Sequence, residues 1–486
     1  MLGLQSCLST LTLRKRPRLS FFSKIMACAL TLDVSPPVHR WMDTTLQRDA
    51  FKKTIPVLAA RVPASKTGFL LKSDVMKKSL MDLPKIRSVL RDPHDDLKRL
   101  VLLNVSEDVA LSPEVRNFLQ EQSATLVVHN LDLTYDYWTA DEILHSILPE
   151  ELCKGSPSGF AITGHLAHMN LNKEYLPYKH IIGQIVLDKN PTIKTVVNKL
   201  DSIDTKYRFF KMELLAGEPD YVVEHHESNC RFTFDFTHVY WNSRLHTEHD
   251  RLVQLFQPTD VIADVFAGVG PFAIPAAKKG CAVFANDLNP ESARYLSQNI
   301  VDNKVASLVR ASCEDGRDFI KKVIGRARDH PFPAYTGPKL SKMQEKEEKR
   351  RLQLAKSSPT AARAPVDQST AENQSPRQTI SHFVMNLPDS AIDFLDAFRG
   401  ILLESASERD LSGNYANMPM VHCHCFTREL QSDRAEADII QRVESKLGHK
   451  LDPDSEVALH MVRSVAPNKD MYCISFRLPR DVAFAR

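Results

Sequence analysis

The chain lacks several features that mark whole classes of protein. No uncharged apolar run reaches about 18 residues, so neither a membrane-spanning helix nor a membrane partner is expected. The nine cysteines do not have the spacing of a disulfide framework, which favours a reducing compartment. The net charge of +3 is too small to indicate a nucleic-acid partner by itself, so any basic surface must be local. No repeat is evident, and 486 residues predict two or three domains.

A convincing metal site is also lacking. The densest group of ligand-type residues is His422-Cys-His-Cys425. On a strand, alternation places the two histidines on one face and the two cysteines on the other. One strand cannot surround a tetrahedral ion without ligands from a second segment, so no metal is assigned.

Residues 1–32 contain no acidic residue and carry five basic ones among Ser, Leu and Phe: Arg14, Lys15, Arg16, Arg18 and Lys24. This composition is typical of a mitochondrial transit peptide, and the alternative is a disordered basic tail. The charges interrupt any apolar core, which excludes a secretory signal. A mitochondrial matrix location is therefore expected, with cytoplasmic and nuclear pools possible.

Three further regions follow the transit-like segment. Residues 33–125 mix short apolar and basic stretches and predict a small α/β or irregular domain, for which contact with tRNA is a candidate role. Residues 126–225 predict a second α/β domain, with a helix from Asp141, strands at 160–166 and 180–187, and a helix at 192–200.

Residues 226–486 alternate apolar runs with helix-like stretches, which predicts a parallel, doubly wound sheet. Within them, residues 335–378 are rich first in Lys and Glu and then in Ser, Pro and Gln. We interpret this stretch as a disordered insertion in a loop of the same domain.

A glycine-containing loop joins the first apolar run to the helix after it: Asp264-Val-Phe-Ala-Gly268-Val-Gly270-Pro-Phe272. Glycines let the backbone approach a ligand closely, and the helix that follows offers unpaired N–H groups. The loop alone is also compatible with a dinucleotide, although the third glycine of that pattern is Ala273 here.

Two acids strengthen the prediction of a nucleotide-type cofactor. Asp287 ends the second apolar run, where an acid can accept both ribose hydroxyls of an adenosine. Asp315, followed by Gly316, comes after the third run and could face the adenine amino group. The alternative is that these acids only cap helices.

Asn386-Leu-Pro388 ends the predicted fourth strand, at the sheet edge where open α/β folds bind ligands. The Asn386 side chain offers one acceptor and two donors, which could hold a target base, and Pro388 stiffens the loop.

These motifs together resemble the tRNA (guanine-37 N1) methyltransferase family of eukaryotes and archaea. The resemblance rests on the loop 264–272, Asn286-Asp-Leu-Asn-Pro290, Met385-Asn-Leu-Pro388, and Tyr240-Trp-Asn-Ser-Arg-Leu-His-Thr-Glu-His-Asp-Arg251. It extends from about residue 130 to the C-terminus, excluding the insertion. Residues 1–125 resemble only the eukaryotic branch, loosely.

The resemblance implies a class I methyltransferase domain preceded by smaller domains that bind tRNA, through its anticodon loop and its body. Separately from the resemblance, a monomer is expected. Carried over by position, Glu248 is the general base and Arg208 contacts the guanine, while Asn386 and Pro388 form the target-base loop. It also implies an S-adenosylmethionine site, formed by His249, Asp264, Gly268, Gly270, Asp287, Leu288, Asn289, Asp315, Gly316 and Asn386.

The chemistry agrees with these roles. N1 of guanine carries a proton, which a carboxylate can remove, and an arginine near O6 can stabilise the negative charge that develops there. Three alternatives remain: a methyltransferase of another RNA base, a nucleotide-dependent oxidoreductase, and an RNA-binding protein without activity. Methylation of pyrimidine C5 is disfavoured because no cysteine nucleophile follows Asn386-Leu-Pro388.

Overall fold

The computed structural model describes two compact units, residues 1–156 and residues 157–486, and each is described by itself. The described positions are 32–42, 44–155, 157, 159–203, 207, 210–337, 346, 350, 375–403 and 415–486. Three sequence predictions lie largely or wholly outside the described positions. They are the transit-like segment, of which only residue 32 is described, most of the insertion, and the site residue Arg208. Among the described residues, no helix is both long and apolar enough to span a bilayer.

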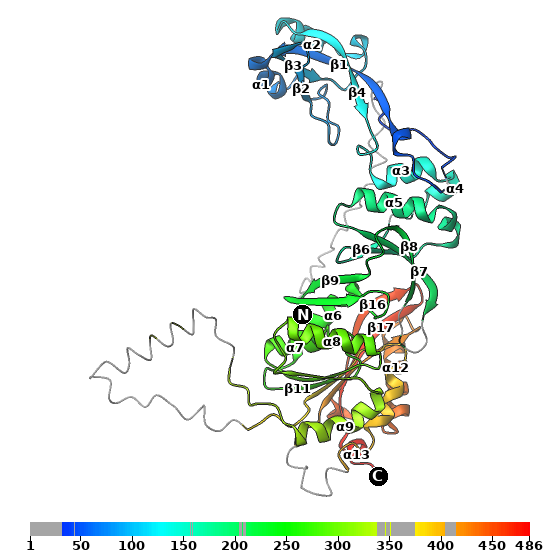
Figure 1. The fold of residues 1–486 in the computed structure, drawn as a ribbon, viewed down its shortest axis with the longest axis vertical. Helices are drawn as coiled ribbons and strands as arrows, with labels where there is room; N and C mark the ends of the chain where they lie inside the picture. The colour runs from blue at the N-terminus through cyan, green and yellow to red at the C-terminus, as the bar shows by residue number, and fades with distance from the viewer. Residues whose placement is uncertain are drawn as a thin grey trace, which may run out of the picture. The chain divides into compact units, whose positions relative to one another are not determined.

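The first unit is built on a four-stranded antiparallel sheet (Figure 1). Its strands, in spatial order, are β2 (Val89–Asp92), β3 (Asp95–Leu102), β1 (Lys53–Pro63) and β4 (Thr125–Leu133). Its helices are α1 (Thr67–Lys72), α2 (Pro113–Glu121), α3 (Ala140–Ile147) and α4 (Glu150–Cys153). The domain boundary predicted at 125/126 falls on the first β4 pair, Thr125 with Arg61, so this sheet extends beyond it.

A capping box starts α3, the helix predicted from Asp141: the Thr139 hydroxyl accepts from the Glu142 N–H, and the Glu142 carboxylate accepts from the Thr139 N–H.

The second unit begins with a small sheet of the order β5 (Ala161–Thr163), β6 (Leu166–Met169), β7 (Thr195–Ile203) and β8 (Phe210–Gly217). Two sequence predictions are wrong here. Residues 180–187 were predicted as a strand, but they belong to helix α5 (Lys179–Lys189), which buries Ile181, Ile182, Ile185 and Val186 on one face. Residues 192–200, predicted as a helix, lie mostly in β7. The short apolar run at 180–187 has no strand-specific alternation, so packing decided its structure.

A hairpin of β9 (Val222–Glu227) and β10 (Cys230–Asp235) follows. The boundary predicted at 225/226 falls inside β9.

A seven-stranded sheet forms the centre of the second unit (Figure 1). In spatial order its strands are β13 (Val309–Ser312), β12 (Ala282–Asn286), β11 (Val261–Asp264), β14 (His382–Met385), β15 (Met420–Thr427), β17 (Lys469–Arg477) and β16 (Ala458–Ala466). The first five are parallel, whereas β17 runs antiparallel to β15 and β16 runs antiparallel to β17. The predicted class I methyltransferase fold is confirmed.

Helices cover both faces of this sheet. Along β11, Ile262 packs with α6 (His246–Leu255), α7 (Ala273–Lys279) and α8 (Pro290–Asp302). Val261 and Ala263, on the other face, pack with α9 (Gly316–Asp329) and α12 (Ser432–Leu447). Burial on both faces explains why the strands have continuous apolar runs. The parallel strands end at one edge, and the chain leaves β11 toward β12 on one side and returns as β14 on the other, which forms the crevice where such sheets bind ligands.

Candidate active site

The loop after β11 contains two glycines whose roles differ. Gly268 and Gly270 have φ of 54° and 102°, values that L side chains rarely adopt. A Cβ on Gly270 would lie 2.8 Å from Ile274 Cδ1 and 2.9 Å from Leu296 Cδ1, so this glycine is needed for packing. A Cβ on Gly268 would meet no atom within 4 Å among the residues that the structure describes. Gly268 therefore faces open space that a ligand can occupy.

Asp264, the last residue of β11, is a buried acid whose carboxyl group receives no well-formed hydrogen bond from a donor among the described residues. It is fully buried, and neither carboxyl oxygen makes a well-formed hydrogen bond within the described part of the chain. Burial, with the nearby charge of Asp287, raises the pKa of Asp264 to about 8. An orphaned carboxyl of this kind is unfavourable unless a ligand supplies the partner, and it commonly marks a functional site.

Asp287, just beyond β12, closes the loop from the side. Its Oδ2 accepts from the Gly268 N–H and its Oδ1 from the Asn289 N–H, both at 2.8 Å. Burial raises the pKa of Asp287. A carboxylate has about four acceptor positions, so two backbone bonds leave capacity for a ligand hydroxyl.

The remaining predicted cofactor residues have visible structural roles. Asn289 is buried and caps α8 by accepting from the Glu291 N–H, while Leu288 is exposed. Asp315 is exposed and caps α9 by accepting from the Arg317 N–H at 2.8 Å. A Cβ on Gly316 would lie 2.8 Å from the Phe266 ring, which accounts for that glycine by packing. Of the two acids for which capping was the alternative, Asp315 does cap a helix, whereas Asp287 accepts from the Gly268 and Asn289 N–H groups.

Asn386 follows β14 at the same edge. Its Oδ1 is buried and has no hydrogen-bond partner among the described residues. The backbone continues through a turn in which the Ser390 and Ala391 N–H groups donate to Leu387 O, and the Phe426 N–H donates to Pro388 O. This loop is therefore fixed by its backbone while one side-chain acceptor remains unsatisfied.

Glu248, in the first turn of α6, is a buried carboxylate held from two sides. Its side chain is 2% exposed. Arg251 donates from Nε to Oε2 at 2.6 Å and from Nη2 to Oε1 at 2.7 Å, and His424 Nε2 lies 2.8 Å from Oε1. Burial opposes ionisation, but the hydrogen bonds from Arg251 and His424 outweigh it and lower the pKa of Glu248 to about 2.

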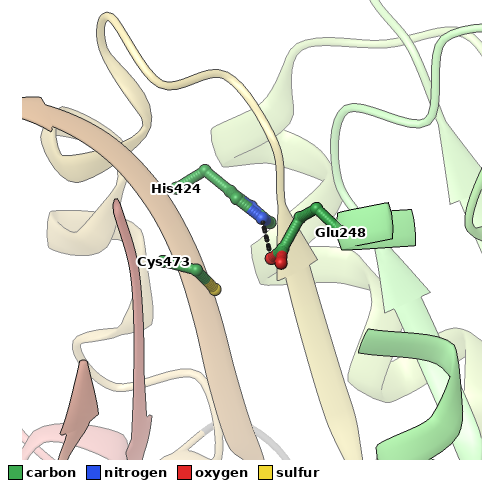
Figure 2. Close-up of side chains that lie close together, drawn as sticks. All are labelled: Glu248, His424 and Cys473. Atoms are coloured by element: carbon green, nitrogen blue, oxygen red, sulfur yellow. Dashed lines mark hydrogen bonds and ion pairs between the residues drawn. The ribbon is translucent and has the colours of Figure 1, made fainter. Parts of the chain in front are cut away.

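His424 and Arg251 are partners of Glu248 that the sequence did not reveal, and Cys473 lies close to Glu248 and His424. His424 is on β15, one residue after the pair Met385–Cys423, which places it beside Asn386. Figure 2 shows the His424 and Cys473 side chains pointing toward Glu248 from neighbouring strands. One sequence pattern could have indicated the contact of His424, namely the alternation of His and Cys at 422–425. Both histidines face α6, whereas Cys423 and Cys425 lie in the core on the other face of the strand.

His249 lies next to Glu248 but faces away from it. It is 3% exposed, its Nδ1 lies 2.5 Å from Glu227 Oε1, and its ring packs edge-on against Phe272 with centroids 4.8 Å apart. His249 therefore contacts the glycine-containing loop 264–272 through Phe272. Its bond to Glu227 joins α6 to β9.

The strand order, the glycine loop at the carboxyl edge and the acids beside it define a class I methyltransferase domain. Residues 223–328 match the TRM5/TYW2 methyltransferase domain, and residues 140–220 match the TYW2 N-terminal domain.

Curated relatives cover nearly the whole chain. A tRNA (guanine(37)-N(1))-methyltransferase of Coprinopsis cinerea is 61% identical over 94% of this chain and 98% of its own length. That of Schizosaccharomyces pombe is 46% identical over 91% and 95%. The crystal structure of Trm5b from Pyrococcus abyssi aligns with a TM-score of 0.52 at 23% identity, over 86% of this chain and 98% of that one. This chain belongs to the tRNA (guanine(37)-N(1))-methyltransferase family.

Proposed function

We propose that this protein uses S-adenosylmethionine to methylate N1 of guanine 37 in tRNA, the nucleotide 3′ to the anticodon. Besides membership of this family, the proposal rests on the groups that gather at the carboxyl edge of the central sheet. There the open side of Gly268, the orphaned carboxyl of Asp264 and the unsatisfied Oδ1 of Asn386 follow neighbouring strands.

The described residues fit the cofactor. Asp264 would supply acceptors for its ammonium group, Asp287 would accept from its ribose hydroxyls, and the backbone at Gly268 would allow the close approach. When bound, S-adenosylmethionine supplies a methyl group on a positively charged sulfur. Leu288 is exposed beside Asp287, where it can cover one side of the adenosine.

Glu248 is proposed to remove the N1 proton of guanine as the nitrogen attacks the methyl carbon. The lowered pKa keeps the carboxylate ionised at neutral pH, so it is ready to accept a proton. The contacts from Arg251 and His424 also weaken it as a base. The proposal therefore requires that the bound tRNA loosen one of these contacts, and that it open the site, because the carboxylate is 2% exposed. Asn386 and Pro388 would hold the guanine, and Arg208 would stabilise charge on O6.

The test is methyl transfer from radiolabelled S-adenosylmethionine to an unmodified tRNA transcript with guanine at position 37, followed by nucleoside mass analysis. N1-methylguanosine should form, and it should disappear with an adenine-37 transcript. Glu248→Gln should lose at least about 100-fold in rate, the contribution typical of a general base.

Glu291→Gln is the matched control. Glu291 forms an (i,i+3) ion pair with Arg294, as Glu248 does with Arg251, but on the exposed surface of α8. The rate of methyl transfer by Glu291→Gln should therefore be unchanged. Label retained on the adenine transcript would favour a methyltransferase of another RNA base. Absence of cofactor binding would reject the proposal as a whole.

We also propose that the enzyme acts as a monomer and that it contacts both the anticodon loop and the body of the tRNA. The composition of residues 1–32 supports import into the mitochondrial matrix, with cytoplasmic and nuclear pools. Imaging of the full chain against a variant without residues 1–31 tests the location, and loss of the mitochondrial signal in that variant is the expected result.

A further inference from the structure

Three side chains lie in a row across neighbouring strands beside Glu248. His424 on β15 is directly opposite Cys473 on β17, and Cys473 is directly opposite His460 on β16. Residues directly opposite each other in a sheet share a face. Glu248 of α6 reaches the same face, as its contact with His424 shows (Figure 2).

These residues form a compact set of metal-ligand atoms. One ligand atom each from Glu248, His424 and Cys473 lie within 4.8 Å of one another, and the side chains are 2%, 0% and 0% exposed. His460 Nε2 lies 3.7 Å from Glu248 Oε2, and its side chain is 48% exposed. The set therefore offers a carboxylate, a thiol and two imidazoles, with the second imidazole connecting the buried part to solvent.

We propose that Glu248, His424 and Cys473, with His460 as the fourth ligand, bind a thiophilic divalent ion such as zinc, and that the ion prevents Glu248 from acting as a base. Sulfur and imidazole ligands in a four-coordinate set are those of zinc, whereas magnesium prefers six oxygens. Binding rests on the geometry alone, and only its inhibitory effect rests on the proposed role of Glu248. A single strand could not build this site, but α6 and β17 supply the ligands that β15 lacks.

The second side of the carboxylate is already supported. Arg251 donates to both Glu248 oxygens, and its guanidinium also interacts with the Cys473 thiol. Binding of the ion therefore requires that Arg251 leave the thiol and keep Oε2, while Oε1 turns from His424 to the ion. His422, two residues before His424, is not available as a ligand. Its Nε2 lies 3.1 Å from His382 Nδ1 and its Nδ1 lies 2.7 Å from Ser475 Oγ.

Binding must release protons, because the metal-binding forms are the thiolate and the neutral imidazole. Acidification should therefore weaken binding, because protons compete with the ion for these ligand atoms. The titratable and charged groups that face His424 are Glu248 and Arg251 from α6, Cys473 from β17, His460 from β16, His422 from β15 and Asp264 from β11.

Cobalt titration of the purified full chain tests the site, because cobalt reports both its ligands and its geometry. We expect a sulfur-to-cobalt charge-transfer band together with the visible bands of tetrahedral cobalt, and displacement of both by zinc. Cys473→Ser should lose the charge-transfer band. Cys425→Ser is the matched control: Cys425 is equally buried but lies on the opposite face of β15, so the band should remain. Circular dichroism establishes that both variants are folded.

Zinc should also reduce methyl transfer at least tenfold, and a chelator should restore it, while magnesium should have no such effect. The ratio of rates with and without zinc should approach one in Cys473→Ser. A missing charge-transfer band in the wild type, or its survival in Cys473→Ser, would overturn the metal site. Zinc binding that leaves methyl transfer unchanged would overturn the inhibitory effect. Absence of methyl transfer in metal-free protein would count against the proposed function and leave the metal site standing.

Discussion

Arg251→Leu tests how strongly the buried ion pair between Arg251 and Glu248 stabilises the second unit. The substitution removes both hydrogen bonds from the guanidinium and leaves His424 as the partner of the carboxylate. The Arg251 side chain is 27% exposed and that of Glu248 is 2% exposed, so the pair is largely shielded from water.

The magnitude follows from two considerations. A pKa of about 2 in place of the ordinary 4.5 corresponds to a net stabilisation of about 3 kcal/mol at neutral pH, which remains after the hydrogen bonds from Arg251 and His424 have offset the cost of burying the carboxylate. Breaking a buried ion pair by removing one partner typically costs about 3–5 kcal/mol. Because Arg251 is partly exposed and His424 remains, we expect a loss of about 2 kcal/mol.

The assay is urea unfolding followed by the fluorescence of Trp241, the tryptophan of the second unit. Only two other tryptophans are present, Trp41 and Trp138 in the first unit, and both are replaced by Phe in every variant. Arg294→Leu is the control, since it breaks an (i,i+3) pair with Glu291 whose side chains are 52% and 44% exposed. Arg294 also lies over the Tyr295 ring, 3.8 Å from its centroid, so that variant should lose no more than about 1 kcal/mol.

The pH dependence has a definite sign. A carboxyl whose pKa is lower in the folded state stabilises the protein above its ordinary pKa, and this contribution is lost as the pH falls from 4.5 toward 2. The difference between wild type and Arg251→Leu should therefore be largest at neutral pH and shrink on acidification through that window. Equal losses for Arg251→Leu and Arg294→Leu, or a difference that does not change with pH, would refute the reasoning.

Three more predictions concern the loop, its acid and the packing of α5. Gly268→Ala keeps the fold but strains the backbone at its φ of 54°, so it should lower the unfolding free energy by about 1 kcal/mol and weaken cofactor binding about tenfold. Gly270→Ala has a φ of 102° and also clashes with Ile274 and Leu296, so it should lower the unfolding free energy by more, about 2–4 kcal/mol; calorimetric binding and urea unfolding distinguish the two variants. Asp264 has a raised pKa, so the stability of the folded protein falls as the pH rises from 3.8 toward about 8. Because an amide does not ionise, Asp264→Asn should raise the Tm of the ligand-free protein at neutral pH, and it should also weaken cofactor binding. An unchanged or lower Tm would contradict this. Gly183→Ala should lower the unfolding free energy of the second unit by about 1–3 kcal/mol, since its Cβ would lie 2.6 Å from Leu215 Cβ, and an unaltered urea midpoint would argue against that packing.

Where chain order and local periodicity carry the information, the sequence was sufficient. The alternation of apolar runs and helices predicted the parallel sheet, because each strand and the loop after it are contiguous in the chain. The same contiguity brought the loop 264–272, Asp287 and Asn386 to one edge, since parallel strands end on the same side. Local reasoning was wrong at α5 and β7, where an eight-residue apolar run fits either structure until its neighbours pack against it.

The surroundings of Glu248 were decided by tertiary structure alone. Whether His424 meets Cys473 depends on the register of two antiparallel strands, and a slip of one residue would turn either side chain to the opposite face. The contact with Glu248 joins residues 176 positions apart and depends on how α6 packs on the sheet. The sequence therefore determined which strand ends gather the predicted cofactor residues. Side-chain partners, burial and the pKa values that follow from them depend on long-range packing, and only the folded chain defined them.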